Sequence, residues 1–229
     1  MTGTSPLPSA PRLLRERALQ IVRADIVEGR LAPGARLTER ELCERLGVSR
    51  TITREIVRQL DVERLVEIEP HRGLRVARLT PRTVTEIYEI RAELEALVAR
   101  KFVATAGDAQ RAELRTRFTQ LQGLVDADDR PGIADGTAGF SRFLIVVSGH
   151  GVAGEILGLL HARINRLRLL SLSRPGRIAA SLAEFSDLVD CLAARDGAGA
   201  ERAVRRNVRN AHAAALAQLD AMHPTSDPD

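Results

Sequence analysis

The 229-residue sequence has no tryptophan, one tyrosine, two cysteines and a single lysine. Its longest run of strongly apolar residues spans positions 143–147, whereas a membrane-spanning helix needs about 20 such residues. The first residues have neither a basic start nor an apolar segment, so we expect a polar tail there and not a signal peptide. Cys43 and Cys191 match no CxxC or zinc spacing, which favours reduced cysteines in a cytoplasmic protein.

The composition is that of a globular protein of one or two domains, with 44% hydrophobic and 28% charged residues. The net charge of +4 comes from the first third of the chain, because residues 1–78 contain 15 arginines and 11 acidic residues and the remainder is neutral. Guanidinium groups suit bidentate contacts to phosphates and base edges, so this distribution indicates nucleic acid as a partner. A GC-rich genome explains the preference for Arg over Lys equally well.

The first 79 residues predict three helices and a β-hairpin. A first helix is expected from Pro11 to Gly29, and a second follows Thr38, which has capping-box spacing to Glu41. Ser49 is a good N-cap for a third helix that runs to about residue 61. Two β-type runs, L-V-E-I-E and G-L-R-V-A-R-L, flank P-H-R-G, the composition of a tight turn. This order of elements is the layout of a winged helix-turn-helix.

One face of the third helix carries three arginines. Arg50, Arg54 and Arg58 fall within about 80° of arc. The opposite side carries Ile52, Ile56 and Leu60. A solvated helix with i,i+4 ion pairs would show the same pattern. As the second helix of a helix-turn-helix, however, it would enter the major groove, where Arg binds the O6 and N7 atoms of guanine.

From Thr80-Pro81 onward the sequence shows only helix signals. We expect helices over residues 81–105, 108–126, 137–149, 152–172, 177–195 and 199–221, separated by Gly, Asp and Pro. The predicted fold class is therefore mainly α, with a winged helix-turn-helix over residues 12–79 and an antiparallel all-helical bundle over residues 80–222. Residues 1–11 and 223–229 are expected to be disordered tails.

The first region has a family resemblance. The run G-R-L-A-P-G-A-R-L-T-E-R-E-L-C-E-R-L-G-V-S-R-T-I-T-R-E-I-V-R-Q-L, followed by L-V-E-I-E-P-H-R-G-L-R-V, resembles the DNA-binding domain of GntR-family bacterial transcription regulators over about residues 12–79. Two places depart from the family pattern: Ile52-Thr53 replace the usual Pro-Val, and Arg64 stands where Gly is common. By resemblance, the DNA-contacting positions, from the second helix to the tip of the wing, are Arg40, Ser49, Arg50, Thr51, Arg54, Arg72 and Gly73.

The second region resembles the all-helical FCD effector domain of the FadR subfamily. The matching segments are Y-E-I-R-A-E-L-E, F-S-R-F-L-I-V-V-S-G-H, L-L-H-A-R-I-N-R-L-R and D-C-L-A-A-R-D. Many members hold a divalent metal through one Asp and three His. Here those positions fall on Thr137, Ser141, Phe185 and Asn207, so we expect no metal at this place. A register shift of two residues would restore one carboxylate, Asp135, but no histidine.

A bundle without metal ligands can still bind an organic effector. By resemblance, Arg91 faces the effector cavity, and Arg163 or Asn165 faces it from another helix. A buried arginine needs a partner, which is either Glu95, one turn later, or an anionic ligand. With Phe185 in place of an imidazole, we expect an organic effector with an apolar part, which carries a carboxylate if Arg91 binds the ligand instead of Glu95. The candidate effector-binding residues are Arg91, Ser141, Arg163, Phe185 and Asn207.

The leading hypothesis is a cytoplasmic homodimeric repressor that binds a two-fold symmetric operator in double-stranded DNA. A small-molecule effector in the bundle would modulate this binding without any cofactor. One alternative is a dimeric DNA-binding regulator whose C-terminal domain is degenerate and senses nothing. The other alternative is an enzyme, but the sequence contains no G-x-S-x-G, P-loop, G-x-G-x-x-G or H-E-x-x-H motif.

Overall fold

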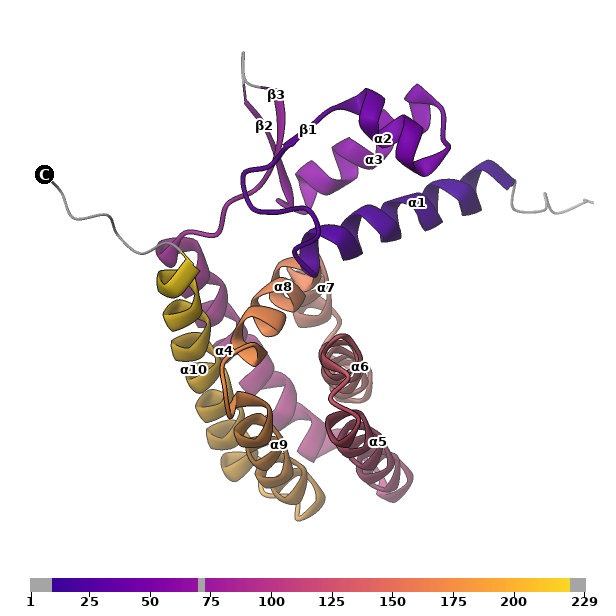
Figure 1. Cartoon of the computed structure of the whole chain (residues 1–229). Coiled ribbons are helices and arrows are strands. Elements are labelled where there is room, and N and C mark those ends of the chain that lie inside the picture. Colours follow the sequence, from indigo (N-terminus) through magenta and orange to yellow (C-terminus); the bar gives the residue numbers. More distant parts are fainter. Residues whose placement is uncertain (1–9, 70–72, 223–229) are drawn as a thin grey trace, which may run out of the picture. The chain divides into compact units, whose positions relative to one another are not determined.

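The computed structural model of the protein describes residues 10–69 and 73–222 and divides into two compact units (Figure 1). The N-terminal unit ends at Arg78 and the C-terminal unit begins at Leu79. Each unit buries its own apolar side chains, so each is described by itself. No helix among the described residues is long and apolar enough to cross a membrane.

The N-terminal unit is a winged helix. Its helices are α1 (Ala10–Val27), α2 (Glu39–Leu46) and α3 (Arg50–Val62), and its strands are β1 (Arg36–Leu37), β2 (Val66–Glu69) and β3 (Gly73–Val76). The central strand, β3, pairs antiparallel with both neighbours, so that Leu74 lies opposite Leu37 on one side and Ile68 on the other. The sequence predicts the hairpin but not β1, because a two-residue strand is too short to show an alternating pattern.

The predicted starts of α2 and α3 are confirmed. The Thr38 hydroxyl accepts a hydrogen bond from the backbone N–H of Glu41 at 3.1 Å, and the Glu41 carboxylate accepts one from the backbone N–H of Thr38 at 3.1 Å. These two bonds form a complete capping box. Ser49 caps α3 in the same way through the backbone N–H of Ile52 at 3.3 Å. Between the helices, Gly47 has a φ of 63°, the left-handed conformation that ends α2.

Two departures from the family pattern have local consequences in this unit. The Thr53 side chain is buried, and its hydroxyl lies 3.1 Å from the sulfur of Cys43, so a polar contact joins α3 to α2. Arg64, just after α3, has a φ of 55°. This left-handed conformation strains any residue with a Cβ, which explains why glycine suits the position. The core between the helices and the sheet contains Val22, Ile26, Ile56, Leu60, Leu65, Val66 and Val76.

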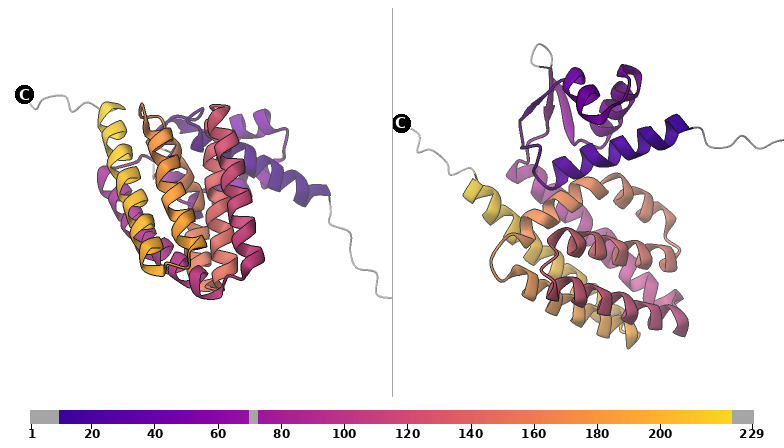
Figure 2. Two further views of the ribbon diagram at one scale, coloured as in Figure 1. Left: turned by 90° about the horizontal axis from the view of Figure 1, so that it is seen from below. Right: turned by 45° about the vertical axis from the view of Figure 1, so that its right-hand side comes forward.

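The C-terminal unit is a helical bundle. Its helices are α4 (Pro81–Thr105), α5 (Asp108–Asp126), α6 (Arg130–Ser148), α7 (Gly151–Leu159), α8 (His161–Leu172), α9 (Arg177–Ala193) and α10 (Gly197–Met222). The two longest helices, α4 and α10, run side by side, and α10 also packs on α8 and α9 (Figures 1 and 2). Across the bundle, α6 packs between α4 and α5. The largest fully buried side chains include Tyr88, Phe102, Leu114, Leu167 and Leu192.

Some boundaries differ from the sequence prediction. α6 begins at Arg130 instead of residue 137, because Asp129 accepts a hydrogen bond from the backbone N–H of Gly132 and caps the helix there. The single helix expected over residues 152–172 is divided at Leu160 into α7 and α8, and no proline marks this break. α1 begins at Ala10, one residue before the expected start at Pro11, and ends at Val27, two residues before Gly29. The rest of both predicted tails lies outside the described residues.

Candidate DNA-binding surface and effector cavity

Helix α3 has one buried face and one arginine-rich face. Thr53, Ile56, Val57 and Leu60 are buried against the rest of the N-terminal unit. Of the apolar residues predicted for the inner side, Ile52 is only half-buried. Arg50, Arg54 and Arg58 are all exposed. The helix therefore presents three guanidinium groups to solvent while its other side anchors it in the core.

The three arginines differ in their partners. Arg54 donates from Nε to Oε2 of Glu39 at 3.1 Å, so α2 restrains its side chain. Both partners are exposed, Arg54 by 64% and Glu39 by 43%, and an ion pair of this kind contributes little stability. Arg50 and Arg58 form no ion pair with a described residue. All three groups are thus accessible to an incoming phosphate or base edge.

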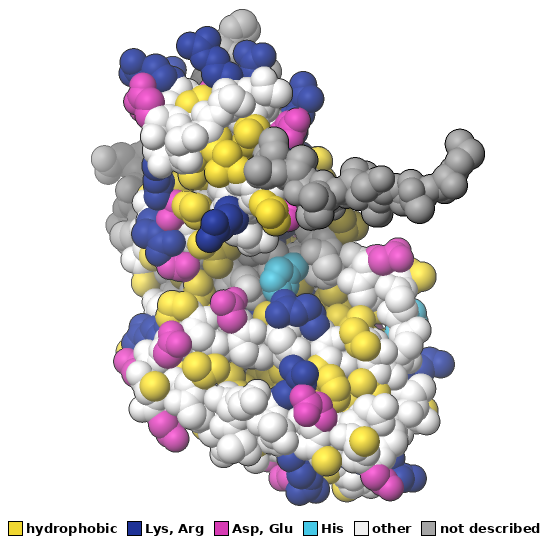
Figure 3. All heavy atoms as spheres, turned by 90° about the vertical axis from the view of Figure 1, so that its right-hand side faces the viewer, with side chains coloured by type: hydrophobic (Ala, Val, Ile, Leu, Met, Phe, Trp, Pro, Cys, Tyr) yellow, Lys and Arg dark blue, Asp and Glu magenta, His cyan; other side chains and the backbone are white. Residues whose placement is uncertain are grey.

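The other predicted DNA-contacting residues that the structure describes are on the surface as well. Ser49, the N-cap of α3, and Thr51 in its first turn are exposed, and Nε of the exposed Arg40 on α2 lies 4.0 Å from Oε1 of Glu44. Gly73 begins β3 with a φ of 78°, which favours glycine. Arg72 lies outside the described residues. Figure 3 shows basic side chains, in dark blue, gathered on the upper part of the view, which is the N-terminal unit.

The bundle contains a small polar cavity of about 20 Å³, lined by side chains of α4, α6, α8, α9 and α10. Its lining includes three of the predicted effector-binding residues, Arg91, Phe185 and Asn207. Ser141 lines a neighbouring cavity of about 30 Å³ together with Phe185 and Asn207. A larger, open groove of about 580 Å³ lies over α6, α7 and α8 and also reaches Ser141. The structure therefore brings four of the five predicted residues together.

The fifth predicted residue, Arg163, is half-buried and lines none of these three spaces. The arginine of α8 that does line these spaces is Arg168, which borders both the polar cavity and the open groove. Sequence reasoning missed Arg168, although it stands four residues after the buried Ile164 and so shares a face of α8 with it. That spacing is the signal that could have found it.

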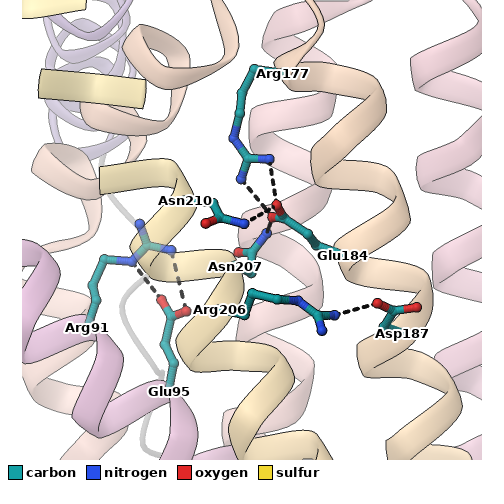
Figure 4. Close-up of polar contacts among 8 residues, drawn as sticks. All are labelled: Arg91, Glu95, Arg177, Glu184, Asp187, Arg206, Asn207 and Asn210. Atoms are coloured by element: carbon teal, nitrogen blue, oxygen red, sulfur yellow. Dashed lines mark hydrogen bonds and ion pairs between the residues drawn. The ribbon is translucent and has the colours of Figure 1, made fainter. Parts of the chain in front are cut away.

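Arg91 has an internal partner. Its Nε donates to Oε1 of Glu95 at 2.9 Å, one turn along α4, and both side chains are largely buried (Figure 4). Burial disfavours the charge on Arg91, but Glu95 and Tyr88 together outweigh this effect and hold the Arg91 pKa above its ordinary value. Of the two partners that the sequence left open for Arg91, the structure contains Glu95.

Glu184 on α9 is the centre of a second buried network. Its carboxylate accepts hydrogen bonds from Nη1 and Nη2 of Arg177 at 3.1 and 2.8 Å (Figure 4). From α10, the side-chain amide of Asn207 donates to it at 2.6 Å and that of Asn210 at 2.8 Å. The fork of Arg177 neutralises the carboxylate, and the two amides complete its hydrogen bonding. Asn207 is thus a structural donor at this position.

The four positions that hold metal in related domains do not fit a divalent metal here. The hydroxyls of Thr137 and Ser141 donate to backbone carbonyls of their own helix, at 2.7 and 3.1 Å. Phe185 has no ligand atom and packs edge-on against Phe140, with ring centroids 5.4 Å apart. Asn207 is engaged by Glu184, and Asp135 is exposed. Within the described residues, no group of three or more His, Cys, Asp or Glu is placed to hold a metal ion.

Arg168 carries a buried charge without an acidic partner. It is 8% exposed, and its Nη1 donates to Oδ1 of Asn165 at 2.5 Å and to the backbone carbonyl of Ala134 at 3.4 Å. No carboxylate among the described residues lies within 4.0 Å of its guanidinium. Burial, with a smaller contribution from the positive charge of Arg91, lowers the pKa of Arg168 to about 10, so the group stays charged at neutral pH.

The N-terminal unit is a winged helix-turn-helix, and the C-terminal unit is an all-helical bundle. The family model "Bacterial regulatory proteins, gntR family" matches residues 14–76, and the model "FCD domain" matches residues 86–210, which is more than half of the chain. The protein belongs to the GntR family, in the group that carries an FCD domain.

Individual proteins agree with this assignment. The chain is 26% identical over 202 residues to the HTH-type transcriptional repressor RspR of Escherichia coli (strain K12), covering 88% of each chain. It is 30% identical over 179 residues to an HTH-type transcriptional regulator in an unstable DNA locus of Streptomyces ambofaciens, covering 78% of this chain and 75% of the other. The solved structure of E. coli McbR/YncC has the same fold, with a TM-score of 0.77 at 23% identity over 93% of this chain and 99% of the other.

Proposed function

We propose that the protein is a sequence-specific transcriptional regulator that reads DNA with the exposed face of α3. The observation that carries this proposal is the set of exposed arginines, Arg50, Arg54 and Arg58, on the second helix of a GntR-type helix-turn-helix. In the major groove, such side chains bind guanine O6 and N7, while Arg40, Ser49 and Thr51 contact phosphates. The wing residues Arg72 and Gly73 reach the adjacent backbone or minor groove.

The protein acts as a homodimeric repressor in the cytoplasm. A dimer places two copies of α3 on the half-sites of a two-fold symmetric operator, about one helical turn apart. Repression is assigned instead of activation because the relative RspR is named as a transcriptional repressor.

A small organic effector in the bundle modulates operator binding. The FCD match and the adjoining cavities of the C-terminal unit support this role. The paired rings of Phe140 and Phe185 favour an effector with an apolar part, and the donor set supports binding without a metal. Effector and DNA affinities are then linked through one coupling free energy, so the effector weakens operator binding by as much as DNA weakens effector binding.

The test is fluorescence anisotropy with a labelled duplex from the region upstream of the protein's own gene. Loss of a base contact costs about 1–3 kcal/mol, so Arg50→Ala or Arg54→Ala should weaken binding by roughly 5- to 150-fold. Arg115→Ala is the matched control, because Arg115 is exposed on α5 and its loss changes the net charge equally. If both α3 variants bind as tightly as Arg115→Ala, α3 is not the recognition helix.

A further inference from the structure

We infer that Glu39 is a positioning residue that determines how selectively α3 reads DNA, because its carboxylate fixes the side chain of Arg54. Held in this way, Arg54 meets a guanine with its Nη1 and Nη2 groups, while the negative charge beside it weakens its attraction to phosphates. This inference rests on the proposed function, since it names the residue that sets the specificity of the proposed recognition helix. Glu39 is outside the set of DNA-contacting positions that the sequence predicts.

The start of α2 fixes the position of Glu39. It is the first residue of the helix and directly follows the N-cap Thr38. The carboxylate of Glu41, the other acidic residue of this turn, accepts the backbone N–H of Thr38 at 3.1 Å and completes the capping box. Glu39 has no part in that box, so its carboxylate is available to α3. The N–H groups at the start of a helix also stabilise a negative charge there.

The packing of α3 on α2 fixes the position of Arg54. The residue before it, Thr53, is buried, and its hydroxyl lies 3.1 Å from the sulfur of Cys43 on α2. This contact anchors α3 to α2 next to the residue that carries the guanidinium. The hydrogen bond from Nε of Arg54 to Oε2 of Glu39, at 3.1 Å, then joins side chains that are 15 positions apart in the chain. Both partners of the pair are therefore attached to helices whose relative register is set by the core.

The pair leaves the outer end of the Arg54 guanidinium free. Arg54 donates to Glu39 through Nε, and it forms no other hydrogen bond with a described residue. Its Nη1 and Nη2 groups carry the remaining N–H donors, and this end of the fork can bind O6 and N7 of one guanine together. An arginine that is already held loses less conformational freedom on binding, which favours the geometry in which it is held. The pair therefore prepares Arg54 for a bidentate base contact.

The same carboxylate discriminates against phosphates. Arg50 and Arg58, the other arginines of this face, form no ion pair with a described residue. Phosphate contacts supply most of the non-specific affinity and carry no sequence information. The charge of Glu39 repels phosphates along any duplex, whereas a guanine base is neutral and is not repelled in this way. Glu39 should therefore lower non-specific affinity and raise specific affinity, so that the ratio of the two is the quantity it controls.

The test measures this ratio for Glu39→Ala by fluorescence anisotropy at constant ionic strength. One labelled duplex comes from the region upstream of the protein's own gene, and the other is a scrambled duplex of equal length and composition. We expect the ratio of specific to non-specific affinity to fall by about threefold or more, a factor within the range that exposed ion pairs contribute. A partly unfolded variant would lose both affinities by the same factor, so a purely structural effect leaves the ratio unchanged.

Glu44→Ala is the matched control. Glu44 is also on α2, its side chain is 67% exposed, and its Oε1 lies 4.0 Å from Nε of Arg40. The substitution removes the same charge next to an arginine that is assigned to phosphates and not to bases. It should change both affinities by the same factor and leave their ratio as in the wild type. If Glu39→Ala has the same ratio as Glu44→Ala, the inference is wrong.

A double-mutant cycle shows whether Glu39 acts through Arg54. If it does, the variant with both Glu39→Ala and Arg54→Ala should have the same ratio as Arg54→Ala alone, because the side chain that Glu39 positions is already absent. A further fall of the ratio in the double variant would show that Glu39 acts independently of Arg54, and this outcome would overturn the inference.

The failure of this inference is distinguishable from the failure of the proposed function. If Arg50→Ala and Arg54→Ala bind as tightly as Arg115→Ala, α3 is not the recognition helix and the role of Glu39 is refuted with it. If Arg54→Ala weakens specific binding but Glu39→Ala has the same ratio as Glu44→Ala, the recognition helix stands and only the positioning role of Glu39 is wrong.

Discussion

The buried Arg177–Glu184 pair offers a direct test of the bundle's polar core. Arg177 is 7% exposed and Glu184 10%, and the two side chains meet as a bidentate ion pair. Arg177→Met removes the counter-charge but keeps most of the apolar side-chain volume. Glu184 then keeps only two amide donors, from Asn207 and Asn210, for a buried negative charge.

The expected loss is large because the remaining charge stays buried. Removing one partner of a buried ion pair costs about 3–5 kcal/mol of unfolding free energy. At roughly 2–4 °C per kcal/mol for a protein of this size, the melting temperature of the C-terminal unit should fall by about 6–20 °C. Adding Glu184→Gln to Arg177→Met should restore most of this stability, because the charge disappears while one oxygen still accepts from the amides.

Tyrosine fluorescence is the appropriate assay. Tyr88 is the only tyrosine, no tryptophan is present, and Tyr88 is buried in α4, so the signal reports unfolding of the C-terminal unit alone. Arg206→Met is the control, because Arg206 of α10 pairs with Asp187 of α9 close to the same network, but these two side chains are 45% and 60% exposed (Figure 4). This exposed pair should contribute less than about 1 kcal/mol. If Arg177→Met costs no more than Arg206→Met, the reasoning about the buried pair is refuted.

Three further predictions concern other positions. Thr38→Ala breaks the capping box of α2 and should destabilise the N-terminal unit by about 1 kcal/mol, measured by circular dichroism on heating, with the exposed Thr51→Ala as control. Arg64→Gly relieves a φ of 55° and should stabilise the same unit by about 1 kcal/mol, whereas a loss of stability would show that the Arg64 side chain outweighs the strain. Burial lowers the pKa of His212 below 6.5, so the unfolded chain binds its proton more readily and the stability of the bundle should fall as the pH drops through 6.5. In urea titrations at about pH 7.5 and pH 5.5, His212→Phe should show a smaller pH dependence than the wild type, and an equal dependence would refute the assignment.

The sequence alone predicted the N-terminal unit in detail, because its signals are local. A cap bonds to a residue three positions away, as Thr38 does with Glu41, and the arginines of α3 share a face through the four-residue spacing of the helix. These relations need no knowledge of the rest of the chain. The same reasoning placed α4 and α5 within their observed bounds.

Local sequence patterns could not predict the contacts between segments that are far apart in the chain. The start of α6 is among glycines that normally disfavour a helix, and Gly136 is tolerated because its missing Cβ leaves room for Leu121 and Leu124 of α5. Helix periodicity identified which residues face inward, but not which inward residues meet.

The sequence by itself therefore determined the family, the two-part architecture and the arginine face of α3. The tertiary structure alone decided the electrostatics of the cavity. It pairs Glu184 with Asn207, 23 positions away, and places no carboxylate of the described residues within 4.0 Å of the Arg168 guanidinium. The physical reason is that a helix fixes the direction of its side chains locally, whereas the partner of a buried charge depends on how whole helices pack against each other.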